Sequence, residues 1–285
     1  MNIIFYGIAF LLGLVAGSFL NVFVLRAHTG QKLTGRSKCM SCGRQLIWSD
    51  LIPVVSFFIL KGKCRRCGSR ISWQYPVVEL LTGLVFMLIA LKVGWVFGLG
   101  TILALLFYWF MAFFFLAITI YDIRHFIIPD DWLLIMAPVA FLSPILASFS
   151  LGAEQLTQMA NGVLAGVVFF SLFWLIWKLS QGRLIGLGDG KLTVIIGLWL
   201  GLSVGGLAII LAFWIGAVYG LVLIGLTYIM SRWGLALKSK LFASWLTQTV
   251  SLKTAVPFGP FLVLGTWLVW FFDWKFGDLI NFFIF

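Results

Sequence analysis

Uncharged apolar runs of about 20 residues recur along almost the whole chain, and they limit what it can fold into. The hydrocarbon core of a bilayer is about 30 Å thick, a distance that roughly 20 helical residues cross. Of the 285 residues, 62% are hydrophobic and only 10% are charged. A soluble protein carries more charge than this on its surface. The sequence therefore predicts an all-α, polytopic membrane protein.

The apolar runs predict about eight transmembrane helices joined mostly by short loops. The loop from Gly201 to Gly206 is so short and glycine-rich that the sixth and seventh helices should form a tight hairpin. The predicted spans cover residues 3–25, 75–93, 98–120, 131–149, 160–178, 190–204, 206–230 and 257–275.

The distribution of basic residues predicts the orientation in the membrane. The first apolar run lacks the basic start of a cleavable signal, and basic residues begin only at Arg26. We expect this run to remain as an anchor with its N-terminus outside. That orientation places 18 of the 20 Lys and Arg residues on the cytoplasmic side, as the positive-inside rule requires. The net charge of +11 therefore indicates membrane topology, not a nucleic-acid partner.

This topology places four segments in the cytoplasm or at its membrane surface. They are residues 26–74, 121–130, 179–189 and 231–256. The expected location is the inner (plasma) membrane, with the lipid bilayer itself as a partner.

All four cysteines lie between the first and second predicted spans, as two C-x-x-C pairs separated by 21 residues. Two such turns can bring four thiolates together as the tetrahedral ligands of a structural zinc ion. Two disulfides would instead need an oxidising compartment, and a redox C-x-x-C would need a βαβ pattern that is absent here. The insert is too small to be stable on an apolar core alone, so zinc would help it fold. The predicted ligands are Cys39, Cys42, Cys64 and Cys67.

Two aspartates stand where a predicted helix meets the cytoplasmic side. Asp122 ends the third span, and Asp189 begins the sixth. Ionisable groups at such places are costly and are candidates for function. Two neighbouring carboxyls can share one proton, so that one acts as acid and the other as base. Each also has a structural interpretation, Asp122 as a helix-end charge near Arg124 and Asp189 as a helix N-cap.

Other residues near the membrane boundary could assist this chemistry. Gly186 and Gly188 precede Asp189 and would let a substrate backbone approach closely. Glu79 lies a few residues inside the second span, where a buried acid is expensive. It could hold the basic residues or the amine of a substrate, or it could pair with Arg26 or Lys191. The residue pattern leaves both interpretations open.

Six motifs in order resemble the type IV prepilin leader peptidase and N-methyltransferase family, whose members are G-x-G-D aspartic peptidases. The resemblance runs nearly end to end. The motifs are Gly17–Arg26, Leu46–Ser56 between the cysteine pairs, Tyr75–Gly83, Tyr121-Asp122 with Ile128-Pro129-Asp130, Gly186-x-Gly188-Asp189 followed by Lys191, and Pro257–Phe261.

The resemblance implies that Asp122 and Asp189 form the catalytic pair. The expected substrates are prepilins or pseudopilins with a short basic leader, which is cut after Gly at the cytoplasmic face. The resemblance also implies methylation of the new N-terminus with S-adenosylmethionine. The resulting division is a first helix (1–25), a zinc-binding insert (26–74) and a seven-helix membrane aspartic peptidase domain (75–285).

Three other functions fit parts of the sequence. A G-x-G-D protease that cuts within the membrane would use the same aspartates but would not need the zinc insert. A non-catalytic membrane scaffold could use the insert to bind another component of a pilus or secretion assembly. A transporter could use membrane carboxylates as proton carriers, although no acid lies at the middle of a predicted span.

Overall fold

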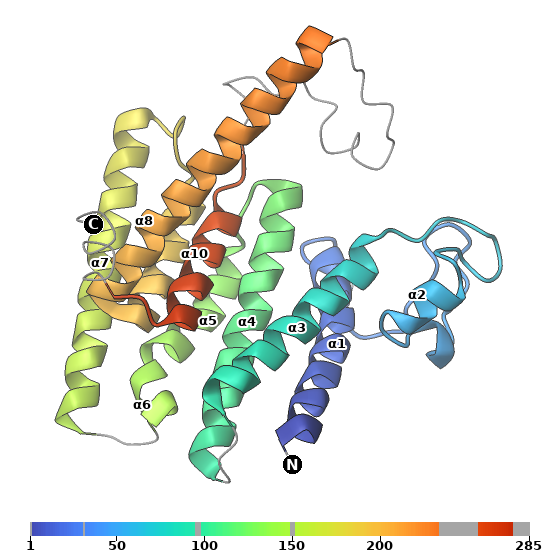
Figure 1. Cartoon of the computed structure of the whole chain (residues 1–285), viewed down its shortest axis with the longest axis horizontal. Helices are drawn as coiled ribbons and strands as arrows, with labels where there is room; N and C mark the ends of the chain where they lie inside the picture. Colours follow the sequence, from blue (N-terminus) through green and yellow to red (C-terminus); the bar gives the residue numbers. More distant parts are fainter. Residues whose placement is uncertain (1, 31, 95–97, 149–151, 234–255, 276–285) are drawn as a thin grey trace. The chain divides into compact units, whose positions relative to one another are not determined.

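The computed structural model describes the chain except for residues 1, 31, 95–97, 149–151, 234–255 and 276–285 (Figure 1). Over the described residues the chain is helical, with two isolated β-bridges in the cysteine-containing segment. The predicted all-helical class is confirmed for this part of the chain. The helices are α1 (Asn2–Arg26), the 3₁₀ turn η1 (Trp48–Asp50), α2 (Val55–Ile59), α3 (Gln74–Val93), α4 (Leu99–His125), α5 (Asp130–Phe141), α6 (Ser143–Ser148), α7 (Ala153–Ser180), α8 (Leu187–Trp233) and α10 (Gly259–Phe272).

Five described helices are long and apolar enough to cross a membrane, namely α1, α3, α4, α7 and the part of α8 from Leu187 to Gly225. The apolar helix α10 is shorter, with 14 residues. Described helices overlap each of the eight predicted spans with different boundaries, and eight separate crossings stay a prediction. The predicted cytoplasmic segment 231–256 lies almost wholly outside the described residues.

The fourth predicted span, residues 131–149, consists of two short helices, α5 and α6. Pro138 lies inside α5 and cannot donate a backbone hydrogen bond to the turn before it. Its carbonyl accepts from the Leu142 N–H at 3.1 Å, just after α5 ends. Pro144 stands in the first turn of α6, where a missing N–H costs little. Helix α5 continues through Pro138 to Phe141, and the break comes just before Pro144, whose missing N–H cannot bond back to the preceding turn.

A sharp bend at Gly201 divides α8 into two arms. Gly201 has φ 72° and ψ −173°, a combination that is open essentially only to glycine. Beyond it the chain turns back, since a Cβ added at Gly205 would lie 3.6 Å from the carbonyl oxygen of Ile196. Nine residues of straight helix would instead separate these positions by about 13 Å. The predicted hairpin is present, and a single residue makes the turn.

The chain divides into two compact units, Met1–Tyr121 with Leu134–Met159, and Asp122–Leu133 with Ala160–Phe285. In the first unit, α1 and α3 cross in contact (Figure 1). Glycines let their backbones approach, since a Cβ at Gly13 would lie 2.7 Å from the Cα of Gly83. The Asn21 amide donates to the Tyr75 carbonyl at 3.2 Å. This bond joins the end of α1 to the start of α3, so both ends of the insert are held together.

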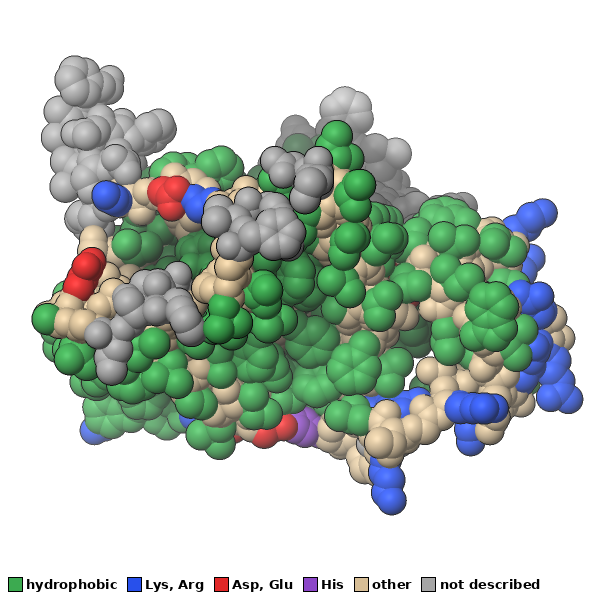
Figure 2. Space-filling model, turned by 90° about the horizontal axis from the view of Figure 1, so that it is seen from below, with side chains coloured by type: hydrophobic (Ala, Val, Ile, Leu, Met, Phe, Trp, Pro, Cys, Tyr) green, Lys and Arg blue, Asp and Glu red, His purple; other side chains and the backbone are tan. Residues whose placement is uncertain are grey.

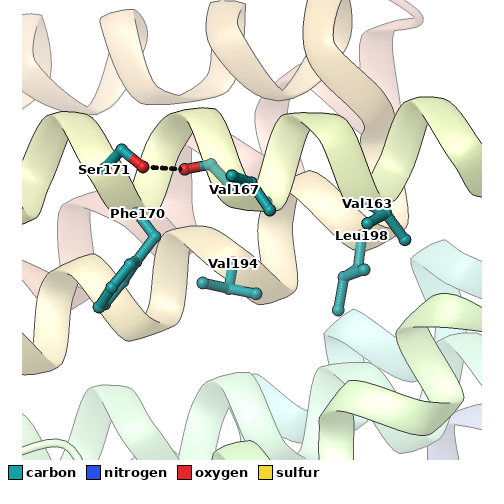
Figure 3. A pocket seen from close by; sticks show the side chains of 7 residues that line it. Val163, Val167, Phe170, Ser171, Val194 and Leu198 are labelled. Carbon is teal, nitrogen blue, oxygen red and sulfur yellow. Dashed lines mark hydrogen bonds between the residues drawn. The ribbon is translucent and has the colours of Figure 1, made fainter.

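In the second unit, α7 and α10 pack against α8. Gly166 faces Gly197 closely, because a Cβ at Gly197 would lie 2.5 Å from the Gly166 nitrogen. A shallow groove between α7 and α8 is lined by Val163, Gly166, Val167, Phe170, Ser171, Val194 and Leu198 (Figure 3). The only polar side chain among them, Ser171, donates to the Val167 carbonyl at 2.7 Å. The groove therefore offers an apolar surface without groups that could bind a charged ligand.

Candidate active site and metal centre

Asp122 lies in the last turn of α4, which continues to His125, beyond the predicted end of that span. Its side chain is buried, with 4% of the residue exposed. The Oδ2 atom accepts a hydrogen bond from the Gly259 N–H at 3.1 Å. Gly259 is the first residue of α10, so a helix N-terminus, where N–H groups lack partners, faces the carboxyl.

Asp189 occupies the first turn of α8 and is also buried. Its Oδ2 atom accepts a hydrogen bond from the Gly186 N–H at 3.2 Å. Gly186 immediately precedes the helix, so Asp189 reaches back from the third helical position to the residue that caps it. Asp189 is therefore not the N-cap residue itself, as one interpretation of the sequence expected, but it accepts from the N–H of the residue at that position. The capping bond uses one carboxyl oxygen only.

The two aspartates belong to one site within the second unit. Ile128 lies next to the glycine of each motif, since Cβ atoms added at Gly188 and Gly259 would meet its side chain at 3.2 Å and 3.3 Å. Asp122 bonds to Gly259 and Asp189 follows Gly188, so both acids stand around the Ile128 side chain. Two carboxyls that approach each other can share one proton, because two like charges close together oppose each other. Such a pair presents an acid beside a base.

The glycines of the Gly186-x-Gly188-Asp189 motif have a packing reason within the protein. A Cβ at Gly188 would press on Ile128, and one at Gly186 would lie 3.2 Å from the Asp189 Oδ2 atom. Glycine at these two positions thus avoids tight contacts with Ile128 and with the Asp189 carboxyl. Their predicted role in substrate approach stays a prediction.

Lys191, one turn into α8, pairs with Asp130 at the start of α5. The ammonium nitrogen lies 2.7 Å from both carboxyl oxygens. The pair is substantially exposed to solvent, so its contribution to stability is about 0–1 kcal/mol. It nevertheless neutralises an acid eight residues from Asp122 in sequence and orients the start of α8. Sequence reasoning did not pair these residues.

Glu79 lies in the first unit, 7% exposed, and binds the backbone of the insert. Its Oε2 atom accepts from the Val54 N–H at 2.7 Å. Val54 has φ 62° and ψ −52°, and the Val55 N–H bonds to the Pro53 carbonyl at 2.6 Å. These values describe a γ-turn, which is strained for a β-branched residue. Glu79 therefore supports a strained turn in the insert.

The two expected partners of Glu79 bind elsewhere. The Arg26 guanidinium donates to the carbonyls of Lys32 and Leu33, at 3.1 Å and 3.2 Å. Lys191 binds Asp130. The observed contact is thus with the insert backbone, an interpretation that sequence reasoning did not include.

The four cysteine sulfurs lie within 4.8 Å of one another, and none is in a disulfide. The Cys39 and Cys67 sulfurs are 3.8 Å apart. Sulfurs at the corners of a zinc tetrahedron with bonds of about 2.3 Å are about 3.8 Å apart. The residues present therefore fit a tetrahedral metal ion.

Both C-x-x-C turns have the same backbone. Gly43 and Gly68 both have φ 68°, the left-handed conformation that glycine adopts without strain. Their N–H groups bond to the Cys39 and Cys64 carbonyls, at 2.9 Å and 3.0 Å. Each turn thus directs its two thiols to one side, as the spacing predicted.

Backbone N–H groups also point at the sulfurs. Hydrogen bonds from the Cys42 backbone, the Ser69 side chain and the Ser41 backbone lower the pKa of the Cys39 thiol to about 6. Hydrogen bonds from Ser69 lower the pKa of Cys67. The Cys42 pKa rises to about 11 despite a bond from the Arg44 backbone, because burial and the neighbouring sulfurs oppose a further negative charge. A cation at the centre would remove this opposition.

Comparison with known proteins places the whole pattern in a family. Residues 11–93 match the model of the bacterial peptidase A24 N-terminal domain, and residues 109–221 match that of the type IV leader peptidase family. A prepilin leader peptidase/N-methyltransferase from Dickeya chrysanthemi is 33% identical over 216 residues, or 67% of this chain and 72% of the relative. The chain belongs to the type IV leader peptidase family.

Other relatives with the same name support this assignment. The one from Aeromonas salmonicida is 29% identical over 294 residues, which cover 93% of this chain and 90% of the relative. The one from Myxococcus xanthus is 35% identical over 193 residues, or 67% of this chain but 55% of the relative's length. No solved structure matches the chain.

Membership in the type IV leader peptidase family confirms two predictions. The resemblance in the ordered motifs is correct, and the chain is an enzyme of the leader peptidase/N-methyltransferase type. The first family model ends with α3 and contains the complete insert, whereas the second begins within α4 and contains both aspartates.

Proposed function

We propose that this protein is a membrane aspartic endopeptidase that removes the basic leader of type IV prepilins or pseudopilins after Gly. The observation that carries the proposal is the pair Asp122 and Asp189, buried in one site and each held by the N–H of a glycine at a helix start. The names of the relatives supply the substrate class.

The geometry of the pair supports a metal-free hydrolysis. One carboxylate takes a proton from water, and the water oxygen attacks the carbonyl carbon of the peptide bond. The other carboxyl, protonated beforehand, gives its proton to the leaving nitrogen, and the carbon–nitrogen bond breaks. One oxygen of each aspartate is engaged by a backbone N–H, which orients the carboxyl for this exchange.

The proposed topology has eight crossings, with the N-terminus outside and the site at the cytoplasmic face of the inner membrane. Five long apolar helices, the bend at Gly201 and the basic residues of the insert support it. A basic leader would remain in the cytoplasm, with its scissile bond near the membrane surface. The proposed division into a first helix (1–25), an insert (26–74) and a peptidase domain (75–285) follows this topology.

The proposed function involves two cofactors, of which zinc is supported by the cysteine cluster and S-adenosylmethionine by the relatives' name. Zinc would bind Cys39, Cys42, Cys64 and Cys67 and stabilise the insert, with no open position for catalysis. Methylation of the new N-terminal amine follows from the relatives' name, and S-adenosylmethionine would supply the methyl group. The apolar groove between α7 and α8 does not fit such a charged donor.

The test is cleavage of a prepilin-like substrate by wild type, Asp122→Asn and Asp189→Asn, with mass spectrometry of the new N-terminus. Each change removes an ionisable carboxyl, so cleavage should fall by about 10²-fold or more. Asp131→Asn, on the exposed first turn of α5, should cleave normally. A methylated product would add the second activity.

The outcomes separate the alternatives. Normal cleavage by either Asn variant would reject the aspartate pair. If well-folded wild type cuts no Gly-leader substrate, the non-catalytic scaffold becomes the better interpretation. Cleavage within the apolar segment of a substrate would instead indicate a protease that acts inside the membrane.

A further inference from the structure

The insert contains an apolar segment that packing within the protein leaves exposed. No charged residue stands between Asp50 and Lys61. In the structure, Val55, Phe58 and Ile59 of α2 are 50%, 57% and 69% exposed, and Leu51 and Ile52 before it are 42% and 37% exposed. Apolar runs of this length at a membrane are typical of interfacial segments, because they are too short to span.

A hydrogen bond within the first unit holds this segment beside the start of α3. Val54, which precedes α2, is bonded to Glu79. Glu79 is five residues after the start of α3, and a helix rises about 1.5 Å per residue, so it lies about 7.5 Å along the helix. Because Glu79 belongs to an apolar helix long enough to span a membrane, its bond to Val54 holds the segment beside the first turns of that helix.

Aromatic contacts also hold α2 beside the start of α3. Phe57 is buried, and its ring packs on Trp73, the residue directly before α3, with the ring centroids 4.8 Å apart. The ring of Phe58 also packs near Trp73, with the two ring centroids 6.3 Å apart. The inner face of α2 is thus packed against the entry of α3, which leaves Val55 and Ile59 directed outward. Trp48 and Trp73, 78% and 53% exposed, flank the segment as tryptophans do at membrane interfaces.

The charge around the segment matches an anionic surface. The insert from Arg26 to Gln74 has ten Lys and Arg residues and one acid, Asp50. The Asp50 side chain is 4% exposed and pairs with Arg65 at 3.0 Å, so the accessible charges are basic. Figure 2 shows Lys and Arg side chains gathered at the right of the view, beside hydrophobic surface.

We propose that the segment 51–59 is an interfacial anchor that inserts into the lipid headgroup and acyl boundary, with the surrounding basic residues on anionic phospholipid headgroups. The anchor would hold the zinc-stabilised insert flat against the membrane beside α1 and α3. This proposal concerns the insert alone and does not depend on the cleavage reaction.

The test uses the full-length protein with a photoreactive benzophenone amino acid at Ile59, in vesicles of phosphatidylethanolamine and phosphatidylglycerol. The matched control carries it at Met40, which is 84% exposed on the first cysteine turn. After illumination, mass spectrometry should find lipid adducts at position 59 at least tenfold above those at position 40. Phosphatidylglycerol should be enriched in the adducts above its share of the vesicles.

Unchanged metal content in both labelled proteins would show that the insert is folded. Lipid adducts at position 59 no more frequent than at position 40 would overturn the proposal. Adducts between two copies of the chain at position 59 would also overturn it, in favour of self-association. Adducts with the bulk lipid composition would reject the role of the basic residues in selecting anionic headgroups.

Discussion

At the scale of single residues, Asp122 and Asp189 each accept a hydrogen bond from a glycine N–H. One of these glycines is close to its aspartate in the sequence and the other is far away. Gly186 is three residues from Asp189, whereas Gly259 is 137 residues from Asp122. Both glycines donate a backbone N–H, and an added Cβ would lie 2.6 Å from the Asp122 Oδ2 atom at Gly259 but 3.2 Å from the Asp189 Oδ2 atom at Gly186. Catalytic geometry at this site therefore depends on backbone positions as well as on the two acids.

Gly259→Ala should reduce cleavage strongly. The new methyl group would lie 2.6 Å from the Asp122 Oδ2 atom, so the carboxyl or the start of α10 must move. A displacement near 1 Å can cost about 10²-fold in rate, and we expect a loss of at least about tenfold in kcat/KM. The measurement is the rate of leader removal in detergent.

The matched control is Gly220→Ala, since a Cβ there meets no atom within 4 Å. It should cleave at the wild-type rate. Normal activity of Gly259→Ala would mean that the N–H contact to Asp122 has no part in the reaction.

At the scale of elements, the insert and α8 each depend on a few local features. The insert has few buried apolar side chains, so its order rests on the cysteine cluster and on contacts with α3. The two arms of α8 are joined through a single residue with a backbone conformation that other amino acids avoid. A single substitution in each element, at a cysteine of the cluster or at Gly201, tests its role.

Cys64→Ser should remove the metal from the insert. Loss of one of four thiolates leaves an incomplete tetrahedron, and we expect bound zinc to fall from about one ion per chain by at least about tenfold. Elemental analysis of the purified protein measures this. The control is Ser41→Ala, at an exposed position between the first two cysteines, which should keep its metal. Retention of zinc by Cys64→Ser would contradict a four-cysteine site.

Gly201→Ala should destabilise the second unit. An alanine at φ 72° and ψ −173° costs about 1–3 kcal/mol. Its methyl group would also lie 2.5 Å from the Asn161 side-chain nitrogen. Thermal unfolding in detergent should therefore shift down by roughly 2–10 °C. Gly225→Ala, in open space on the same helix, should not shift the midpoint, and an equal midpoint for both would argue against the bend.

At the scale of the whole molecule, the proposed orientation in the membrane rests on where the basic residues lie. Of the 20 Lys and Arg residues, ten lie in the insert, and the segments predicted to face outside contain only Lys92 and Lys275. Moving the insert across the membrane would require translocation of this positive charge, which is strongly disfavoured.

Reporter fusions should alternate in side along the chain. A reporter that is active only outside the cytoplasm should be inactive after Gly30 and Gln181, and active after Gly94 and Ser203. A reporter that fluoresces only inside should give the reverse pattern. The fusion after Ser203 is the most informative, because it tests whether the two arms of α8 cross separately. Equal results at Gln181 and Ser203 would reject eight crossings.

The sequence by itself determined the features that rest on local pattern. Apolar run length requires membrane helices, and C-x-x-C spacing with a following glycine requires turns that direct two thiols together. The order of the motifs around Asp122 and Asp189 identified the family. Gly201 was visible as part of a glycine-rich hairpin, although not as the single residue that makes the turn.

Only the tertiary structure decided which distant groups meet. The Gly259 N–H on Asp122, the Lys191 pair with Asp130 and the Glu79 bond to Val54 join residues 137, 61 and 25 positions apart. Sequence reasoning considered other partners for Glu79, because any nearby base could satisfy a buried acid. The observed partners depend on how helices and loops pack, and a single sequence contains no local signal for that choice.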